Sequence, residues 1–383
     1  MLSGIEEAEE FRSYIAKWTD ERLMPHAEEI DVAGDFPREL AQELGELGYI
    51  GTMYPESAGG SGLEYPNLCF AILCEELSRA SVGFAAWICM QGSTATHTIY
   101  EWGNDYLREK YFHPALKGEK ICAFAISEPG AGSDAASVRT KATKVDGGWV
   151  INGSKMFTSN GTVADFITVV ASTDLSKGAK GLELFVVDTS FDGFSVSNKL
   201  DKMSVRSSDT AALSFDEMFV PDDHMLSSET GNGFRNAYRS LTVDRIFTAA
   251  LAVGNARAAY ESARNYAQDR EQFGQPIVNF QAVDFRLVDM LANVELMTMY
   301  TYHAAKLADQ GDDITVEAAL AKLIAGEKGH QVCHDAVNVY GGWGLMNEYP
   351  VQRFLRDSYF PMVGGGTMDI MRMIIGRRAN RAK

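Results

Sequence analysis

The chain has 383 residues, of which 46% are hydrophobic and 23% are charged, and its formal net charge is −17 at pH 7. This length predicts two or three domains, and the composition is typical of a globular protein with a large buried core. The strongly negative charge argues against a nucleic-acid or anionic-membrane partner, because phosphate binding requires clustered Lys and Arg.

The cysteines and the N-terminal residues exclude further classes. The five cysteines form no CxxC pair and lie mostly in apolar runs: Cys69, Cys74, Cys89, Cys122 and Cys333. We expect buried reduced thiols rather than disulfides or metal ligands. The first residues, MLSGIEEAEEF, contain no signal-peptide core, and no apolar run approaches the roughly 20 residues that span a bilayer. We therefore expect a cytoplasmic protein without membrane insertion.

Residues 1–119 are predicted to form an N-terminal helical domain. Their periodicity is helical from about residue 5 to 118, and Phe11, Tyr14, Ile15 and Trp18 have the spacing of one apolar stripe. A Gly/Ser/Pro-rich loop, YPESAGGSGLEY, then separates this helix from helical patterns that resume over 67–83 and 86–112. The pattern predicts a helical bundle.

Residues 120–228 are predicted to form a β domain. Short β-rich runs are separated by turn residues, and they occur at 149–157, 165–172, 182–188 and 211–221. No helical pattern lies between them. This favours an antiparallel barrel or sandwich and excludes a parallel Rossmann sheet.

Residues 229–383 return to long helical patterns. They cover 234–268, 277–310 and 315–340, and a last helix starts at about 367. Ala-rich stretches such as TAALAVGNARAAY permit the close helix packing of a four-helix bundle. The predicted class is therefore α+β, with helical, β and helical domains in that order.

Six motifs carry a family resemblance. They are AISEPGAGSDAAS (125–137), GSKMFTSNG (153–161), RSSDT (206–210), DREQFGQPIVNFQ (269–281), YGGWGLMNEYP (340–350) and FLRDSYFPMVGGGT (354–367). Together and in this order, they are similar to the acyl-CoA dehydrogenase superfamily over the whole chain. The resemblance implies an enzyme with FAD as cofactor, an acyl-CoA substrate, an electron-transferring flavoprotein as acceptor, and a homotetramer.

The resemblance also implies a flavin site. A flavin requires hydrogen-bond donors at its ring edge, an apolar wall and backbone amides near its pyrophosphate. The residues implied within one subunit are Phe124, Ile126, Ser127, Gly132, Ser133, Phe157, Ser159, Thr367 and Asp369. Phe157 and Ser159 stand where the family usually has Trp and Thr. The neighbouring subunit is expected to hold the adenine end of FAD through Arg270, Phe273, Gln281, Asn338, Gly341 and Gly342.

The usual catalytic acid of the family is missing. Its Glu precedes the Gly-Thr of the last motif, and Gly365 occupies that position. Some members carry the base on the long C-terminal helix, immediately before an Arg. Here Asp244 precedes Arg245, so Asp244 is the predicted base, one methylene shorter than Glu. The alternative is a surface or interfacial Asp that pairs with Arg245 or with a helix neighbour.

The expected substrate pocket differs from that of the relatives whose pocket helix it resembles. The helix from Trp87 to Ala95 is similar to glutaryl-CoA dehydrogenase, but the Arg that binds the distal carboxylate in that enzyme corresponds to Ala85, which disfavours a dicarboxylyl substrate. Gln91 either bonds the acyl end or is an ordinary satisfied helix Gln. The other predicted substrate-binding residues are Ser133, Leu241, Arg245, Gly365 and Gly366. The glycines widen the pocket, which favours a short, branched or alicyclic acyl-CoA.

Two alternative functions remain open at this level. The first is a family member with other chemistry, such as 1,4-dehydrogenation of a cyclic enoyl-CoA, enoyl-CoA reduction or desulfination. The second is a catalytically silent subunit that partners an active paralogue.

Overall fold

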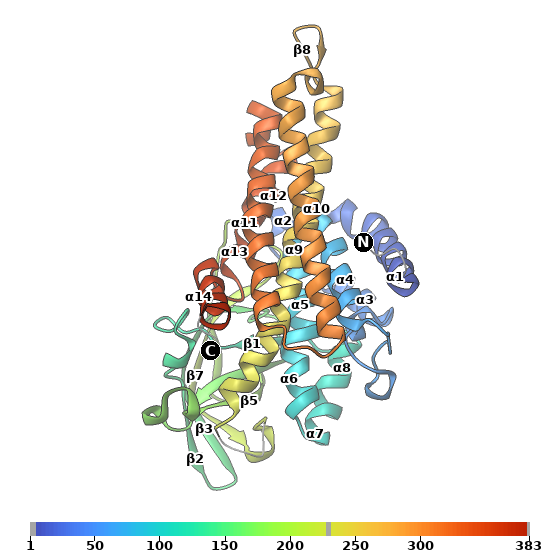
Figure 1. Ribbon diagram of the computed structural model, residues 1–383. Helices are drawn as coiled ribbons and strands as arrows, with labels where there is room; N and C mark the ends of the chain where they lie inside the picture. Colours follow the sequence, from blue (N-terminus) through green and yellow to red (C-terminus); the bar gives the residue numbers. More distant parts are fainter. Residues whose placement is uncertain (1–4, 227–230, 381–383) are drawn as a thin grey trace.

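The computed structural model describes residues 5–226 and 231–380 (Figure 1). Its first part is helical, as predicted. The helices are α1 (Glu6–Trp18), α2 (Ala27–Ala33), α3 (Arg38–Glu46), α4 (Pro66–Ala80), α5 (Val82–Cys89), α6 (Ala95–Trp102), α7 (Asp105–Leu107) and α8 (His113–Leu116). A π-helical turn, Met90–Thr94, joins α5 to α6.

The predicted stripe of α1 is correct except at one position. Ile15 and Trp18 are buried, and Phe11 packs against the core from a partly buried position. Tyr14 is instead 59% exposed, and its hydroxyl donates to Glu10. The amphipathic character of Tyr allows its ring to lie at the edge of the stripe with the hydroxyl in solvent.

The middle part is a seven-stranded sheet. Its strands are β1 (Cys122–Ala125), β2 (Lys141–Val145), β3 (Gly148–Ser159), β4 (Phe166–Ser172), β5 (Leu182–Asp188), β6 (Phe194–Lys199) and β7 (Thr210–Pro221). The order is β1-β4-β2-β3-β7-β6, and β5 pairs with β4. Most pairs are antiparallel, as expected, but β4 pairs in parallel with β1 and, through Lys141 and Ser172, with β2. The expected antiparallel β domain therefore includes two parallel pairings.

Strand β4 connects the two hydrophobic cores. All seven of its residues are buried. Ile167 and Val169 face the core of the β domain, whereas Phe166 and Val170 belong to the core shared with the helices. Because side chains alternate along a strand, this run can be apolar on both faces. The β domain is thereby joined to the helices through a continuous apolar contact.

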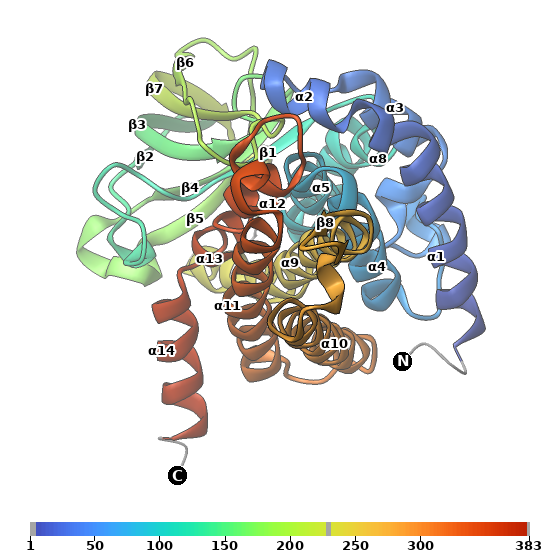
Figure 2. The ribbon, with the colours of Figure 1, turned by 90° about the horizontal axis from the view of Figure 1, so that it is seen from above.

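The last part contains three long helices, α9 (Gly233–Asp269), α10 (Gln281–Asp309) and α11 (Thr315–Tyr340), and three short ones, α12 (Val351–Asp357), α13 (Phe360–Val363) and α14 (Met368–Ala379). The long helices project beyond the rest and end at a small hairpin, β8 (Glu271–Gln272) and β9 (Gln275–Pro276) (Figure 1). The helical bundle is confirmed. Viewed from above, α4 stands beside α9 and α10, while α14 points away from them (Figure 2). The fourth helix of the bundle that contains α9, α10 and α11 is therefore α4 rather than the last helix, α14.

Buried ion pairs connect α4 to α1 and α9. The carboxylates of Glu75 and Glu76 are almost completely buried. Arg257 of α9 lies 2.8 Å from Glu75 and 2.6 Å from Glu76, and Arg12 of α1 lies 3.1 Å from Glu75. Arg79 adds a pair with Glu76 at 2.7 Å. Removing one partner of such a cluster would leave an uncompensated buried charge.

No helix within residues 5–226 and 231–380 is long and apolar enough to cross a membrane. The five cysteines are buried free thiols, and the sulfurs of Cys74 and Cys89 are 3.4 Å apart.

A single glycine allows α9 to approach α4. A Cβ at Gly254 would overlap the Glu75 carbonyl group and the Ser78 hydroxyl. We predict that Gly254→Ala lowers the free energy of unfolding by about 3 kcal/mol, since overpacking forces the two helices apart. Denaturant unfolding followed by circular dichroism measures this. Gly376→Ala on α14 is the control, because an added Cβ there meets only the Asn380 amide at 4.0 Å. Equal stability of the two variants would contradict the prediction.

Candidate active site

Asp244 lies in a buried polar cluster on α9. The residue is 9% exposed. The Thr94 hydroxyl, from the π-helical turn, donates to Oδ1 at 3.0 Å, and the Thr248 hydroxyl approaches Oδ2 at 3.5 Å. Burial raises the pKa of Asp244, while the Thr94 hydrogen bond and the nearby cations oppose this shift. A carboxyl with a raised pKa in a buried site has the properties of a general base.

The structure brings Gly365 directly opposite this carboxylate. A Cβ built on Gly365 would lie 3.5 Å from Oδ2 of Asp244 and 3.6 Å from the Thr248 hydroxyl. The backbone of Gly365 is left-handed, with φ of 65°, and that of Gly366 also has a positive φ, 107°. The two positions considered for the base from sequence thus converge on one place.

Lys322 of α11 completes the cluster, and sequence reasoning missed it. Its side chain is fully buried, and Nζ donates to the Gly366 carbonyl oxygen. Burial, and repulsion from Arg245, lower the pKa of Lys322 to about 7. The available signal was a lone Lys within the apolar run AALAKLIAG, which α11 buries.

Arg245 turns away from Asp244 along the helix. It is 3% exposed, its guanidinium carbon lies 4.8 Å from the centre of the Tyr238 ring, and Nη1 donates to the Thr242 hydroxyl at 3.3 Å. Its Nε is buried and has no hydrogen-bond partner within the described parts of the chain. The simple Asp244–Arg245 pair considered from sequence is therefore not formed. Leu241, one turn before Arg245, is partly buried.

Gln91 does not line a pocket. It is fully buried, and its Nε2 donates to the carbonyl oxygens of Ala115 at 2.9 Å and Lys120 at 2.7 Å. Its Oε1 accepts from the Cys122 amide at 2.9 Å. Every hydrogen-bonding group of this side chain is in use, so Gln91 is the satisfied helix residue and anchors the start of β1.

The expected ring-binding residues gather at one edge of the β domain. Phe124 is buried on β1, whereas Phe157 of β3 is 70% exposed and has a positive φ of 59°. The segment after β1 is tied to β3, because the Met156 amide donates to the Ser127 carbonyl oxygen at 2.9 Å. Ile126 is partly buried beside Ser127. An exposed, strained aromatic side chain is a feature of binding sites.

The hydroxyl groups expected to contact the flavin are not hydrogen-bonded to other described residues of the protein. Within the described residues, the side chains of Ser127, Ser133 and Ser159 make no hydrogen bond. Ser133 lies in an exposed turn, and nothing would lie within 4 Å of a Cβ on the neighbouring Gly132. These free donors, the open turn and the exposed ring of Phe157 fit a flavin and its pyrophosphate.

A buried ion pair supports this edge. Lys155, which has no exposed side-chain surface, donates to Glu128 at 2.8 Å and to the Ile126 carbonyl oxygen at 3.1 Å. Glu128 also accepts from the amides of Arg139 and Thr140 at 2.8 and 2.9 Å. This network holds the backbone on both sides of Ser127. It was not predicted, because Lys155 occurs in a strand motif whose outward residues are polar.

The two residues expected after the glycine loop are partly engaged. The Thr367 hydroxyl accepts from the Ile370 amide at 3.3 Å and caps α14. Asp369 is exposed and lies 3.5 Å from Arg372.

The residues expected at the adenine end lie elsewhere. Arg270 and Phe273 belong to the hairpin at the tip, Gln281 begins α10, and Asn338, Gly341 and Gly342 lie where α11 ends (Figure 1). Phe273 is 93% exposed. A cavity of about 510 Å³ at the tip is lined by residues that include Arg270 and Gly342. The hairpin β8–β9 lies at the end of the projecting helices, whereas β3, which carries Phe157 and Ser159, lies at the opposite end of the molecule (Figure 1). One chain therefore does not bring the two sets together.

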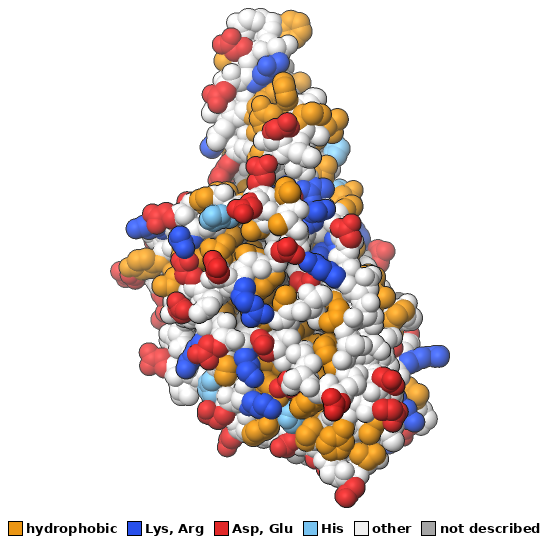
Figure 3. Space-filling model, turned by 180° about the vertical axis from the view of Figure 1, so that it is seen from behind, with side chains coloured by type: hydrophobic (Ala, Val, Ile, Leu, Met, Phe, Trp, Pro, Cys, Tyr) orange, Lys and Arg blue, Asp and Glu red, His pale blue; other side chains and the backbone are white. Residues whose placement is uncertain are grey.

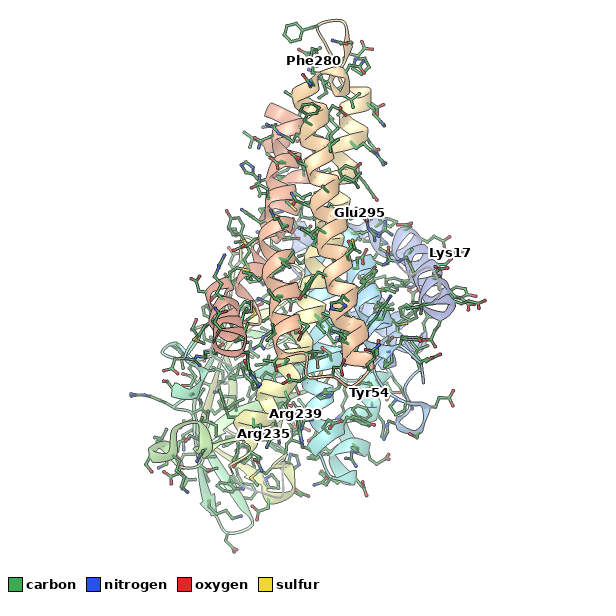
Figure 4. The ribbon with its side chains drawn as sticks, viewed as in Figure 1. Lys17, Tyr54, Arg235, Arg239, Phe280 and Glu295 are labelled. Atoms are coloured by element: carbon green, nitrogen blue, oxygen red, sulfur yellow. The ribbon has the colours of Figure 1, made fainter. Side chains whose placement is uncertain are left out.

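A larger cavity borders the first turns of α9. Its volume is about 960 Å³, and Arg235, Tyr238, Arg239 and Thr242 line one side of it. Tyr54 and the loop between α10 and α11 form other walls (Figure 4). Tyr238 and Thr242 are also the contacts of Arg245, so this cavity adjoins the residue that follows Asp244.

The sequence matches three acyl-CoA dehydrogenase family descriptions in succession. The N-terminal domain matches residues 5–119, the middle domain 123–218 and the C-terminal domain 231–380. Benzylmalonyl-CoA dehydrogenase of Aromatoleum aromaticum is 42% identical over 365 residues, 95% of this chain and 96% of the relative. Mitochondrial isovaleryl-CoA dehydrogenase of Solanum tuberosum is 37% identical over 370 residues, 96% and 89% of the two chains.

Solved structures have the same fold. Butyryl-CoA dehydrogenase of Megasphaera elsdenii has a TM-score of 0.95 at 35% identity, with 98% of each chain covered. Glutaryl-CoA dehydrogenase with glutaryl-CoA also reaches 0.95, at 32% identity over 99% of this chain and 96% of the other. A structure described as the electron transferring flavoprotein of Acidaminococcus fermentans contains a chain with a TM-score of 0.95 at 34% identity over 98% of both chains. The chain therefore belongs to the acyl-CoA dehydrogenase family of FAD-dependent oxidoreductases.

Proposed function

We propose that the enzyme oxidises a short acyl-CoA with a branched or ring-bearing acyl group, with Asp244 as the base and an electron-transferring flavoprotein as acceptor. One observation carries this proposal. The Asp244 carboxylate lies 3.5 Å from the place where a side chain on Gly365 would begin. An acid at either position would therefore reach the same space.

The surroundings of Asp244 suit proton abstraction from the carbon next to the thioester. The Thr94 hydrogen bond holds Oδ1, whereas the only hydrogen bond to Oδ2 from the described residues is the long one from Thr248, and Oδ2 faces the Gly365 gap. Oδ2 is thus available to take the proton, and burial keeps bulk water away from it. When bound, FAD supplies the acceptor for the hydride from the neighbouring carbon. Ser127 and Ser159 offer free hydroxyl groups to orient it.

Two features support the choice of acyl group. Gly364, Gly365 and Gly366 present no side chain above the base, which leaves space for a branch or ring. The relatives also include enzymes named for benzylmalonyl-CoA and isovaleryl-CoA, whose acyl groups carry a ring or a branch.

The cavity beside α9 is the proposed site of the CoA phosphates. Arg235 and Arg239 are one helical turn apart on its wall, and they are labelled in Figure 4. Two guanidinium groups at this spacing can form charge-assisted hydrogen bonds to phosphate. Tyr238 on the same wall packs against Arg245, the residue that follows Asp244 in the chain.

The distant adenine-binding set supports a homotetramer, in which a neighbouring subunit would complete each FAD site. The outer face of α10 has exposed apolar side chains, including Phe285, Val288 and Met299. The projecting end also bears hydrophobic side chains on the face seen from behind in Figure 3, among acidic and basic ones. Apolar surface of this kind is typical of an interface.

The assignment of Asp244 is tested by moving the base. We predict that Asp244→Asn slows anaerobic flavin reduction by isovaleryl-CoA at least about 100-fold, the usual contribution of a general base. The double variant Asp244→Ala/Gly365→Glu should reduce its flavin at least about tenfold faster than Asp244→Ala alone. The gain is limited because the left-handed backbone at Gly365 strains the new residue. Full activity of Asp244→Asn with bound FAD would contradict the assignment.

Asp244 also predicts the pH dependence. A base acts only when ionised, and a raised pKa moves the acidic limb of the rate profile to higher pH than an ordinary Asp would give. We predict that Thr94→Val moves this limb still higher, because the Thr94 hydrogen bond lowers the pKa of Asp244. Stopped-flow flavin reduction across pH measures it. An unmoved limb would sink the prediction.

The Lys155–Glu128 pair predicts how FAD is retained. Lys155→Met leaves Glu128 buried without its cation, which should lower the free energy of unfolding by about 3–5 kcal/mol. It also removes the hydrogen bond to the Ile126 carbonyl oxygen. We expect the purified protein to contain less FAD, as measured by the ratio of flavin to protein absorbance. The control is Lys144→Met, which removes the exposed ion pair with Asp222 in the same domain. Equal FAD content in both variants would contradict this role.

The CoA cavity predicts a substrate-selective defect. Replacing both Arg235 and Arg239 by Gln should raise KM for isovaleryl-CoA by about tenfold or more, since hydrogen bonds to charged groups are lost. KM for isovaleryl-pantetheine, which lacks the nucleotide, should stay unchanged. An equal effect on both thioesters would exclude the cavity as the phosphate site.

A further inference from the structure

We propose that Lys322 is a positioning residue for Asp244, which keeps this carboxylate ionised and anchors the glycine loop that faces it. The inference rests on the proposed function in that it takes Asp244 as the base. It assigns a role to a residue that none of the motifs contains.

The geometry places Lys322 beneath the loop. Its Nζ donates to the Gly366 carbonyl oxygen, and its Cε would lie 3.6 Å from a Cβ on Gly365. That Cβ would also lie 3.5 Å from Oδ2 of Asp244. Lys322 therefore contacts the glycine loop and also borders the gap at Gly365 that Oδ2 of Asp244 faces.

The charges in this cluster do not balance. Asp244 and Arg245 of α9 are the charged groups that act on Lys322. The π-helical turn contributes the uncharged Thr94 hydroxyl, and the buried Cys89 thiol of α5 also interacts with Asp244. The glycine loop presents only its backbone. Two basic side chains thus act on one carboxylate in a buried site, where charge interactions are strong.

The excess of positive charge favours the ionised carboxylate. Burial alone raises the pKa of Asp244 and so favours the protonated form, which cannot act as a base, because desolvation disfavours the charged form. The ammonium of Lys322 opposes this effect, because a nearby positive charge favours the ionised carboxylate and so reduces the rise in the pKa of Asp244. Since the same ammonium is bonded to Gly366, the ionised state of the base is tied to the position of the loop.

The test uses the FAD-loaded enzyme and does not require turnover. The carbonyl stretch of protonated Asp244 is followed in infrared difference spectra during a pH titration and is identified by its absence in Asp244→Asn. We expect Lys322→Met to raise the midpoint by about one pH unit, equivalent to a tenfold change in the protonation constant. Lys322→Arg, which keeps the charge, should restore the wild-type midpoint. With an active thioester, the acidic limb of flavin reduction should move by the same amount.

Lys202→Met is the matched control. Lys202 is partly buried and, like Lys322, donates to a backbone carbonyl oxygen, that of Ser208 at 2.7 Å. We expect this variant to leave the Asp244 midpoint unchanged. A midpoint that is the same in wild type and Lys322→Met would overturn the role of Lys322, even if both enzymes reduce FAD.

Failure of the proposed function gives a different result. If no thioester reduces the flavin, Asp244 is not an active base, but the infrared midpoints still measure its coupling to Lys322. If Lys322→Met does not fold, Lys322→Gln takes its place, because its amide removes the charge but keeps a hydrogen-bond donor for the Gly366 carbonyl oxygen. An Asp244 midpoint in Lys322→Gln equal to that of wild type would overturn the proposal.

Discussion

The close contact between α9 and α4 at Gly254 is the constraint on which the site depends. It brings a 37-residue helix into the core of the N-terminal helices, and the ion pairs of Arg257 hold it there. Because an α-helix is rigid over several turns, this contact also sets the position of Asp244, about three turns away. The same helix borders the cavity proposed for the CoA phosphates and continues along the bundle. One well-packed element thus determines both ends of the proposed substrate path.

The second constraint is the cost of burying charge. Asp244, Arg245 and Lys322 are all nearly inaccessible to solvent, and each influences the protonation of another. Such a group retains its charge only when neighbours replace the hydration it has lost. The cluster therefore makes the acid–base properties of Asp244 depend on tertiary contacts from α11 and from the π-helical turn. A change in any of these elements would alter the base without touching it.

A third constraint is the separation of the two sets of residues proposed to bind FAD. The β domain presents free hydroxyl groups beside the exposed ring of Phe157, while the tip of the long helices presents Arg270 and the exposed ring of Phe273. Rigid helices keep them apart within one chain. Assembly with another subunit is therefore an integral part of the proposed FAD site, and the apolar face of α10 is available for it.

Periodicity and turn residues were sufficient to predict the fold class, the long helices and most strands, because these depend on local patterns. The ordered motifs also indicated the family, and the resemblance to it placed Asp244 and Gly365 under consideration. Only the tertiary structure showed that these two residues face one another, that Gln91 is fully occupied, that Tyr14 is exposed and that β1 runs parallel to β4. It also revealed Lys322, which a single sequence presents as one lysine in an apolar helix. The physical reason is that burial and charge interactions in this site join residues up to 150 positions apart, as between Thr94 and Asp244, and no local pattern records such contacts.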